Sequence, residues 1–194
     1  MTSATGSVRT RVLADLVPGA RLRDAAMIVG GAAFTGLAAQ VSIHTSLSPV
    51  PFTLQTFAVL VTGAALGTLR GVLSLLLYML AGMAGVPWYA AHGHGWGGTS
   101  FGYIIGFVIA AGVVGELARR KADRHVLTTV GLMILGNVVI YAVGVTWLYA
   151  HKPVPSWTFG DAVHYGLTVF LISDAIKLAV AAVLFPAAWK LVRR

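Results

Sequence analysis

The sequence contains no cysteine and few charged residues. The lack of cysteine excludes disulfide bonds, thiolate metal sites and cysteine nucleophiles. Charged residues make up 10% of the 194 residues, whereas a soluble domain usually contains about 25%. Hydrophobic residues make up 57% of the chain and occur in runs long enough for membrane-spanning helices. We therefore expect an integral membrane protein with little room for a soluble domain.

The sequence also lacks the common motifs of energy-converting and hydrolytic enzymes. It has no phosphate-binding loop, no G-x-S-x-G elbow and no H-E-x-x-H pair. His92 and His94 have no nearby carboxylate to complete a metal site, so we expect no bound metal. A membrane enzyme is therefore the least favoured function, and uphill transport would need an ion gradient or a separate ATPase.

Most of the few charges are positive, with a formal net charge of +8. The basic residues flank the apolar runs, which indicates topology signals rather than nucleic-acid binding. If both termini are cytoplasmic, twelve of the fourteen lysines and arginines lie inside, including Arg9, Arg11, Arg193 and Arg194. Residues 1–23 are polar and basic without a signal peptide, so we expect them to form a cytoplasmic segment.

The apolar runs predict an all-α fold in which residues 24–194 form a single membrane domain of six transmembrane helices. Two of these helices are short and share the run 53–86, where the stretch "GTLRG" at 67–71 separates them. The other helices are expected at 25–43, at 99–117, at 126–149 and in a last run that ends near Val192.

The predicted outer loops are rich in proline, glycine and aromatic residues, whereas the inner turns are short and charged. These outer loops cover residues 44–52, 87–98 and 150–164. Binding residues concentrate on loops held by a rigid scaffold, so these loops predict a ligand site on the outer face. The alternative is that they are ordinary loops whose aromatic residues lie at the membrane interface.

The last apolar run contains two opposite charges, Asp174 and Lys177. Each charge would cost roughly 2.5–3.5 kcal/mol at a bilayer centre, and their spacing places them on one helix face. The functional interpretation is a donor and acceptor pair facing an outward-opening cavity, because ionisable groups inside a membrane usually mark a substrate path. The alternative is a self-neutralising pair that only assists insertion.

The start of the last helix decides how deep this pair lies. Ser173 and Asp174 are good N-cap residues, so we expect the helix to begin there. Residues 160–171 would then form a short re-entrant or interfacial piece, which is tolerated where it lines a cavity. The other possibility is one helix from His164 to Lys190, with Asp174 at the midplane.

One polar residue and one pair of small residues predict two further contact sites. Gln55 begins the second helix close to the outer loops, and it is a ligand candidate because a buried amide needs partners. Ala32 and Gly36 form a small-xxx-small pair on the first helix. Such a pair suits either packing inside the bundle or docking of a partner protein, and the sequence leaves both alternatives open.

Five stretches of the chain match one known family. They are "SPVPFTLQTFAVLVTGAALG" at 48–67, "LLYMLAGMAGVPWYA" at 76–90, "GYIIGFVIAAGVVG" at 102–115, "GNVVIYAVGVTWL" at 136–148 and "FLISDAIK" at 170–177. Together they resemble the BioY family, the biotin-specific substrate-binding (S) components of energy-coupling factor (ECF) transporters. The segment "PVPFTLQT" and the D-x-x-K pair carry the most specific part of the resemblance.

The sequence departs from the family pattern at two places. The family commonly has Pro-Gly before the aspartate, where this chain has Ile172 and Ser173. The family also commonly has G-P-T-G-G-Y at the start of the fourth helix, where this chain has "GTSFGY" at 98–103.

The resemblance implies an architecture, a location and partners. Family members are six-helix proteins of the bacterial cytoplasmic membrane that bind biotin in a cavity capped by outer loops. They associate with a transmembrane coupling protein and two cytoplasmic ATPase subunits. Small residues of the first helix contact the coupling protein, which would assign that role to Ala32 and Gly36.

The resemblance also implies how biotin binds, as a transported ligand with no cofactor involved. Asp174 would accept a hydrogen bond from a ureido N–H, and Lys177 would donate to the ureido carbonyl or, alternatively, to the carboxylate. Aromatic side chains would form the apolar walls, with further hydrogen bonds from Gln55 and Thr99. The expected wall residues are Trp88, Tyr89, Trp96 and Tyr103.

Two other functions compete with a biotin-binding subunit. The first is an S component for another vitamin, such as thiamine or riboflavin, which "PVPFTLQT" and the D-x-x-K pair disfavour. The second is a secondary transporter that works without ATPases. The chain has no obvious inverted repeat, which disfavours this second alternative.

Overall fold

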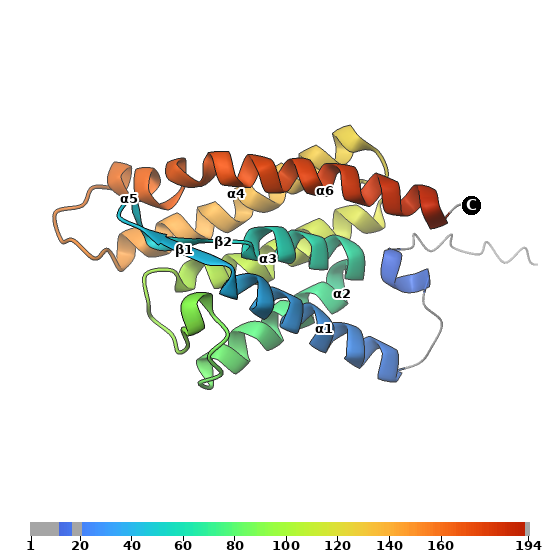
Figure 1. Cartoon of the computed structure of the whole chain (residues 1–194), viewed down its shortest axis with the longest axis horizontal. Helices are drawn as coiled ribbons and strands as arrows, with labels where there is room; N and C mark the ends of the chain where they lie inside the picture. The colour runs from blue at the N-terminus through green and yellow to red at the C-terminus, as the bar shows by residue number, and fades with distance from the viewer. Residues whose placement is uncertain (1–11, 17–20, 193–194) are drawn as a thin grey trace, which may run out of the picture.

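The computed structural model describes residues 12–16 and 21–192, and these residues are mostly helical (Figure 1). The expected topology signals Arg9, Arg11, Arg193 and Arg194 lie outside the described residues. Six α-helices are present in the described part: α1 (Arg21–Gln40), α2 (Gln55–Met83), α3 (Phe101–Arg119), α4 (Val126–Ala150), α5 (Phe159–Gly166) and α6 (Leu171–Val192).

Five helical stretches of the described residues are long and apolar enough to cross a membrane. Four of them are α1 to α4, and the fifth runs from Phe159 to Leu191 and so joins α5 to α6. The chain is therefore a multi-pass membrane protein, as its composition predicted. Short 3-10 turns at Leu13–Leu16, Ala90–His92 and Thr168–Phe170 complete the helical elements.

Helix α2 reverses its direction at Gly67 instead of continuing straight (Figure 1). Gly67 has φ 81° and ψ −179°, a backbone conformation that only glycine adopts readily. A Cβ on Gly71 would lie 3.1 Å from the Cα of Gly63, although eight residues of straight helix would separate the two by about 12 Å. The predicted break at 67–71 therefore exists, while the expectation of six spans stays a prediction.

A β-hairpin corrects the expectation of an all-α fold. Strand β1 (Ser42–Thr45) pairs antiparallel with β2 (Ser48–Thr53), where a plain outer loop was expected. Pro49 and Pro51 prevent a helix here and favour extended residues before them. Both strands are edges of a two-stranded sheet, where proline is tolerated. Helix α1 accordingly ends at Gln40, before its predicted end.

The bundle is organised around α3, which packs between α2 and α4. Helix α1 packs on α2, and α6 packs mainly on α4. Buried side chains such as Leu75, Val114 and Ile140 fill the space between these helices. Helix α6 leaves apolar residues exposed along its outer side, which suits contact with lipid: Ile172, Ile176, Val180, Val183 and Leu184.

The segment before α6 forms a separate short helix, as one of the two alternatives predicted. A capping box between Thr158 and Asp161 begins α5, and the backbone leaves helical geometry at Leu167. A continuous helix from His164 to Lys190 is therefore wrong. The predicted start of the last helix is also wrong, because α6 begins at Leu171 with Asp174 in its first turn.

The capping role that placed this start is not observed. The hydroxyl of Ser173 donates to the carbonyl oxygen of Phe170 at 2.9 Å, inside the helical turn. The 3-10 turn at Thr168–Phe170 instead leads directly into α6, so Ser173 and Asp174 lie inside the first turn of the helix.

Both ends of the described bundle lie on one side of the molecule. The start of α1 and the end of α6 share one end, while the hairpin and the loop after α2 lie at the opposite end (Figure 1). This arrangement agrees with two termini on the same side of a membrane. The assignment of that side to the cytoplasm stays a prediction.

Substitution of Gly67 by alanine tests the reversal in α2. A side chain at this φ is strained, and the Cβ would also lie 3.3 Å from the methyl groups of Val12. We expect a loss of about 1–3 kcal/mol in stability, seen as a lower midpoint of thermal unfolding in detergent. Gly131→Ala in α4 is the control, because its Cβ would meet open space. Equal midpoints for wild type and Gly67→Ala would contradict a glycine requirement.

Candidate functional site

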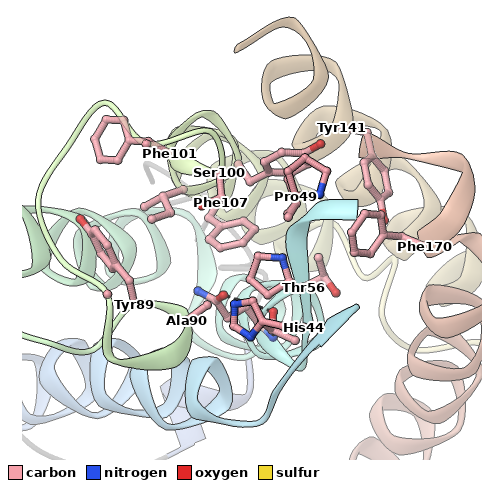
Figure 2. A pocket seen from close by; sticks show the side chains of 18 of the residues that line it. His44, Pro49, Thr56, Tyr89, Ala90, Ser100, Phe101, Phe107, Tyr141 and Phe170 are labelled. Atoms are coloured by element: carbon pink, nitrogen blue, oxygen red, sulfur yellow. Dashed lines mark hydrogen bonds between the residues drawn. The ribbon is translucent and has the colours of Figure 1, made fainter. Parts of the chain in front are cut away.

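A cavity of about 270 Å³ lies at the end of the bundle that carries the hairpin. Its lining comes from the hairpin, the start of α2, the loop between α2 and α3, and from α3, α4 and α6. Figure 2 shows Tyr89 and Phe101 on one side of the cavity and Tyr141 and Phe170 on the other. Aromatic and aliphatic side chains form the larger part of the lining and several polar side chains form the rest, a mixture that suits a small-molecule site.

Asp174 and Lys177 form the predicted pair within this lining. The ammonium nitrogen of Lys177 lies 2.7 Å from Oδ1 of Asp174, and the two side chains are only 14% and 8% exposed. Thr56 bonds both partners: Lys177 donates to its hydroxyl at 3.1 Å, and the hydroxyl donates to Asp174 at 3.3 Å. A buried ion pair needs such additional bonds to offset its desolvation.

Tyr141 supplies the remaining protein contact to the carboxylate. Its hydroxyl donates to Oδ2 of Asp174 at 2.5 Å. A carboxylate has about four acceptor positions, and Tyr141, Thr56 and Lys177 occupy three of them. The ammonium of Lys177 likewise gives two of its three N–H groups to described residues. Within the described residues, Oδ2 of Asp174 thus retains one acceptor position and the ammonium of Lys177 retains one N–H.

Sequence reasoning missed Thr56 and Tyr141 as members of the site. A signal for each was present, because a polar side chain within an apolar span needs a hydrogen-bond partner. Thr56 directly follows Gln55, which the sequence did single out, and Tyr141 lies within the apolar run of α4. The identity of their partner comes only from the tertiary fold.

Six of the eight residues proposed for ligand contact line this cavity. They are Asp174, Lys177, Gln55, Tyr89, Trp96 and Tyr103. Trp96 is 77% exposed and so stands at the mouth. The hydroxyl of Tyr103 already donates to the carbonyl of Gly166 at 2.7 Å, which leaves mainly its ring for the cavity.

The other two proposed residues do not line the cavity. Trp88 donates its indole N–H to the carbonyl of Tyr78 at 2.8 Å, and its ring packs over Gly36. Thr99 is half-buried in a turn between Gly98 and Ser100, and these two neighbours do line the cavity.

Tyr89 contributes a neutral wall to the cavity. Its hydroxyl donates to the carbonyl of Met79 at 2.6 Å. Burial raises the pKa of Tyr89 to about 12, so the phenol stays protonated at physiological pH. The lining also contains the ion pair of Asp174 and Lys177 and the imidazole side chains of His44 and His94.

The small pair on α1 faces the interior of the protein. Ala32 is 1% exposed, and a Cβ on Gly36 would lie 3.2 Å from the ring of Trp88. Of the two alternatives that the sequence left open, the structure therefore shows packing inside the bundle. The exposed face of α1 carries a different set of small residues: Ala26, Gly30 and Ala33.

The fold and the cavity define a helical membrane protein with a small-molecule site at one end of its bundle. A solved structure, described as the S-component for biotin from an ECF-type ABC transporter, has the same fold. The match has a TM-score of 0.77 and 21% identity, and it covers 88% of this chain and 92% of that chain.

Comparison of the sequence identifies the family. The BioY family model matches residues 9–194. The probable biotin transporter BioY of Pyrococcus horikoshii is 34% identical over 167 residues, which cover 84% of this chain and 94% of the relative. The biotin transporter BioY of Thermotoga maritima is 37% identical over 147 residues, which cover 73% and 82% respectively. The chain belongs to the BioY family.

Substitution of Tyr141 by phenylalanine tests the support of the buried carboxylate. It removes one donor from Asp174 and leaves the ring in place, and a hydrogen bond to a charged group contributes about 1.5–3 kcal/mol. We expect a lower midpoint of thermal unfolding in detergent. Tyr149→Phe on the same helix is the control, because the hydroxyl of Tyr149 bonds no described residue. A Tyr141 variant as stable as this control would show that the contact contributes nothing.

Proposed function

We propose that this protein is the biotin-binding S component of an ECF transporter and mediates biotin uptake through the bacterial cytoplasmic membrane. Membership of the BioY family and the named functions of its relatives support this proposal. The observation that carries it is the buried pair of Asp174 and Lys177 in the cavity lining, where Oδ2 of Asp174 and the ammonium of Lys177 each keep one hydrogen-bonding position beyond their contacts with the described residues.

The ureido ring of biotin matches this pair. The ring presents an N–H donor beside a carbonyl acceptor, so Asp174 would accept from the N–H and Lys177 would donate to the carbonyl. Charge-assisted bonds of this kind are strong in a dry site. Asp174 keeps its contacts to Thr56 and Tyr141, and Lys177 keeps its contact to Thr56, so both groups stay in place.

The alternative, in which Lys177 binds the carboxylate of biotin, is less favourable. That carboxylate would approach the charge of Asp174, which lies 2.7 Å from the same ammonium, and like charges repel in a buried site. The mouth of the cavity is the better place for it, because Trp96 is largely exposed there. His94 and Ser100 also belong to the lining and can bind an anion.

The rest of biotin would lie against the apolar walls. The thioether ring and the hydrocarbon tail need contacts with little hydrogen bonding, and aromatic rings with proline supply them. The candidate residues all line the cavity and come from four separate parts of the chain: Pro49, Tyr89, Phe101, Phe107 and Phe170.

Transport requires energy from partner subunits. The sequence has no phosphate-binding loop, so the proposal assigns ATP hydrolysis to two cytoplasmic ATPases and the link to them to a transmembrane coupling protein. The contact on this chain would be the exposed small residues Ala26, Gly30 and Ala33 of α1 rather than the buried Ala32 and Gly36. Small residues let a second helix approach closely in a membrane.

Calorimetric titration of purified protein tests the proposal. Wild type should bind biotin one to one and should bind neither thiamine nor riboflavin. Asp174→Asn and Lys177→Ala should each weaken biotin binding by roughly a hundredfold or more, because each loses a charge-assisted bond in a dry site.

Lys152→Ala is the matched control, because Lys152 bonds the carbonyl of Trp157 outside the cavity. It should bind biotin like wild type. Size-exclusion chromatography of each variant checks that it remains folded in detergent. Unchanged biotin affinity in both cavity variants would refute the assignment of the pair, and binding of another vitamin instead of biotin would refute the substrate.

A further inference from the structure

The side chain of Gln40, the last residue of α1, binds four backbone groups. Its nitrogen shares its two N–H groups among three carbonyl oxygens, those of Gly36 and Trp88, both at 3.1 Å, and that of Tyr89 at 3.2 Å. Its oxygen accepts from the backbone N–H of His92 at 3.2 Å. Three of these groups belong to the loop between α2 and α3, so one side chain ties the end of α1 to that loop.

The loop segment that Gln40 binds has an uncommon backbone conformation. Ala91 has φ 53° and His92 has φ 59°, although neither is glycine. Such residues persist where the surrounding structure holds them in place. The side-chain oxygen of Gln40 accepts a hydrogen bond from the backbone N–H of His92. The neighbouring Tyr89 and Ala90 line the cavity. The contact of Gln40 therefore supports a strained segment directly next to the wall residues Tyr89 and Ala90.

A second chain of hydrogen bonds reaches the same loop from inside the cavity. Gln55, which lines the cavity, donates to the hydroxyl of Tyr78 at 2.8 Å. That hydroxyl donates to the carbonyl of Trp88 at 3.2 Å, and this carbonyl also accepts from Gln40. Tyr78 is fully buried. The cavity, the loop and the end of α1 thus share one hydrogen-bonded network.

We propose that Gln40 is a positioning residue that holds the segment 88–92, and with it the wall residues Tyr89 and Ala90, closed over the ligand and so links the cavity to α1. The inference rests on the proposed function for the identity of the ligand, biotin. Helix α1 is also the helix assigned above to the coupling protein. A displacement of its end would therefore act directly on the wall and allow the ligand to leave.

The loop has other anchors, so loss of Gln40 should leave the protein folded. The indole of Trp88 and the hydroxyl of Tyr89 bond carbonyls of α2. The backbone N–H of Gly95 also donates to the carbonyl of Gly82 at 2.8 Å. Among these hydrogen bonds, those of Gln40 join the segment 88–92 to α1, beside the packing of Trp88 on Gly36, and Gln40 also binds the strained His92.

Gln40→Met tests this role, because methionine has a similar length and no hydrogen-bonding amide. Without ligand, the amides of residues 88–94 should exchange with deuterium roughly tenfold faster than in wild type, and amides of α3 should not change. Biotin should dissociate roughly tenfold faster, while its association rate should change little.

Thr35→Val is the matched control on the same helix. The hydroxyl of Thr35 is buried and, among the described residues, bonds just the carbonyl of Gly31 within α1, at 2.9 Å. This variant should show neither faster exchange at 88–94 nor faster dissociation. The same changes in Thr35→Val and Gln40→Met would mean a general weakening of α1 and would overturn the inference, as would unchanged exchange in Gln40→Met.

The two readouts separate this inference from the proposed function. Hydrogen exchange is measured without ligand, so it decides the role of Gln40 at the wall even if wild type binds no biotin. Failure of wild type to bind biotin would refute the proposed function alone. Faster exchange in Gln40→Met with an unchanged biotin dissociation rate would refute the claim that the wall retains the ligand.

Discussion

The structure of the cavity depends on keeping an aspartate and a lysine charged inside a membrane protein. A buried ion pair is stable only when further hydrogen bonds offset the loss of water. Thr56 at the start of α2 and Tyr141 in α4 provide these bonds to Asp174 and Lys177 on α6. The requirement therefore brings three helices together at one point. One acceptor position of Asp174 and one N–H of Lys177 have no partner among the residues that the structure describes.

Breaks in the helices place the charged pair near the end of the bundle that carries the loops. Helix α6 begins only three residues before Asp174, after the backbone leaves helical geometry at Leu167. Helix α2 likewise begins at Gln55, directly after the hairpin, and folds back at Gly67. Irregular backbone is tolerated at membrane depth where it is covered by protein or lines a cavity, and here it supplies much of the cavity lining. Together these features give an apolar bundle one polar end.

Local patterns predicted what depends on neighbours in the chain. The spacing of Asp174 and Lys177 indicated a shared face, and "GTLRG" indicated the break in α2. The β-hairpin was missed because a proline-rich stretch can be extended without pairing. Contacts such as Tyr141 with Asp174 join residues 33 apart in the sequence, which no local pattern shows. The sequence could not distinguish the inner face of α1 from its lipid-facing side. Both the protein core and the lipid are apolar, and small residues occur on both faces of the helix.

The most direct test asks which part of biotin the charged pair binds. Binding of two analogues, biotin methyl ester and biotin methylated on both ureido nitrogens, should be measured by competition against biotin on the purified wild-type protein. If Asp174 and Lys177 bind the ureido ring, the ester should compete within about tenfold of biotin, and the N-methylated analogue should lose roughly a hundredfold or more. The reverse order, with the ester losing its affinity and the methylated analogue retaining it, would contradict this account.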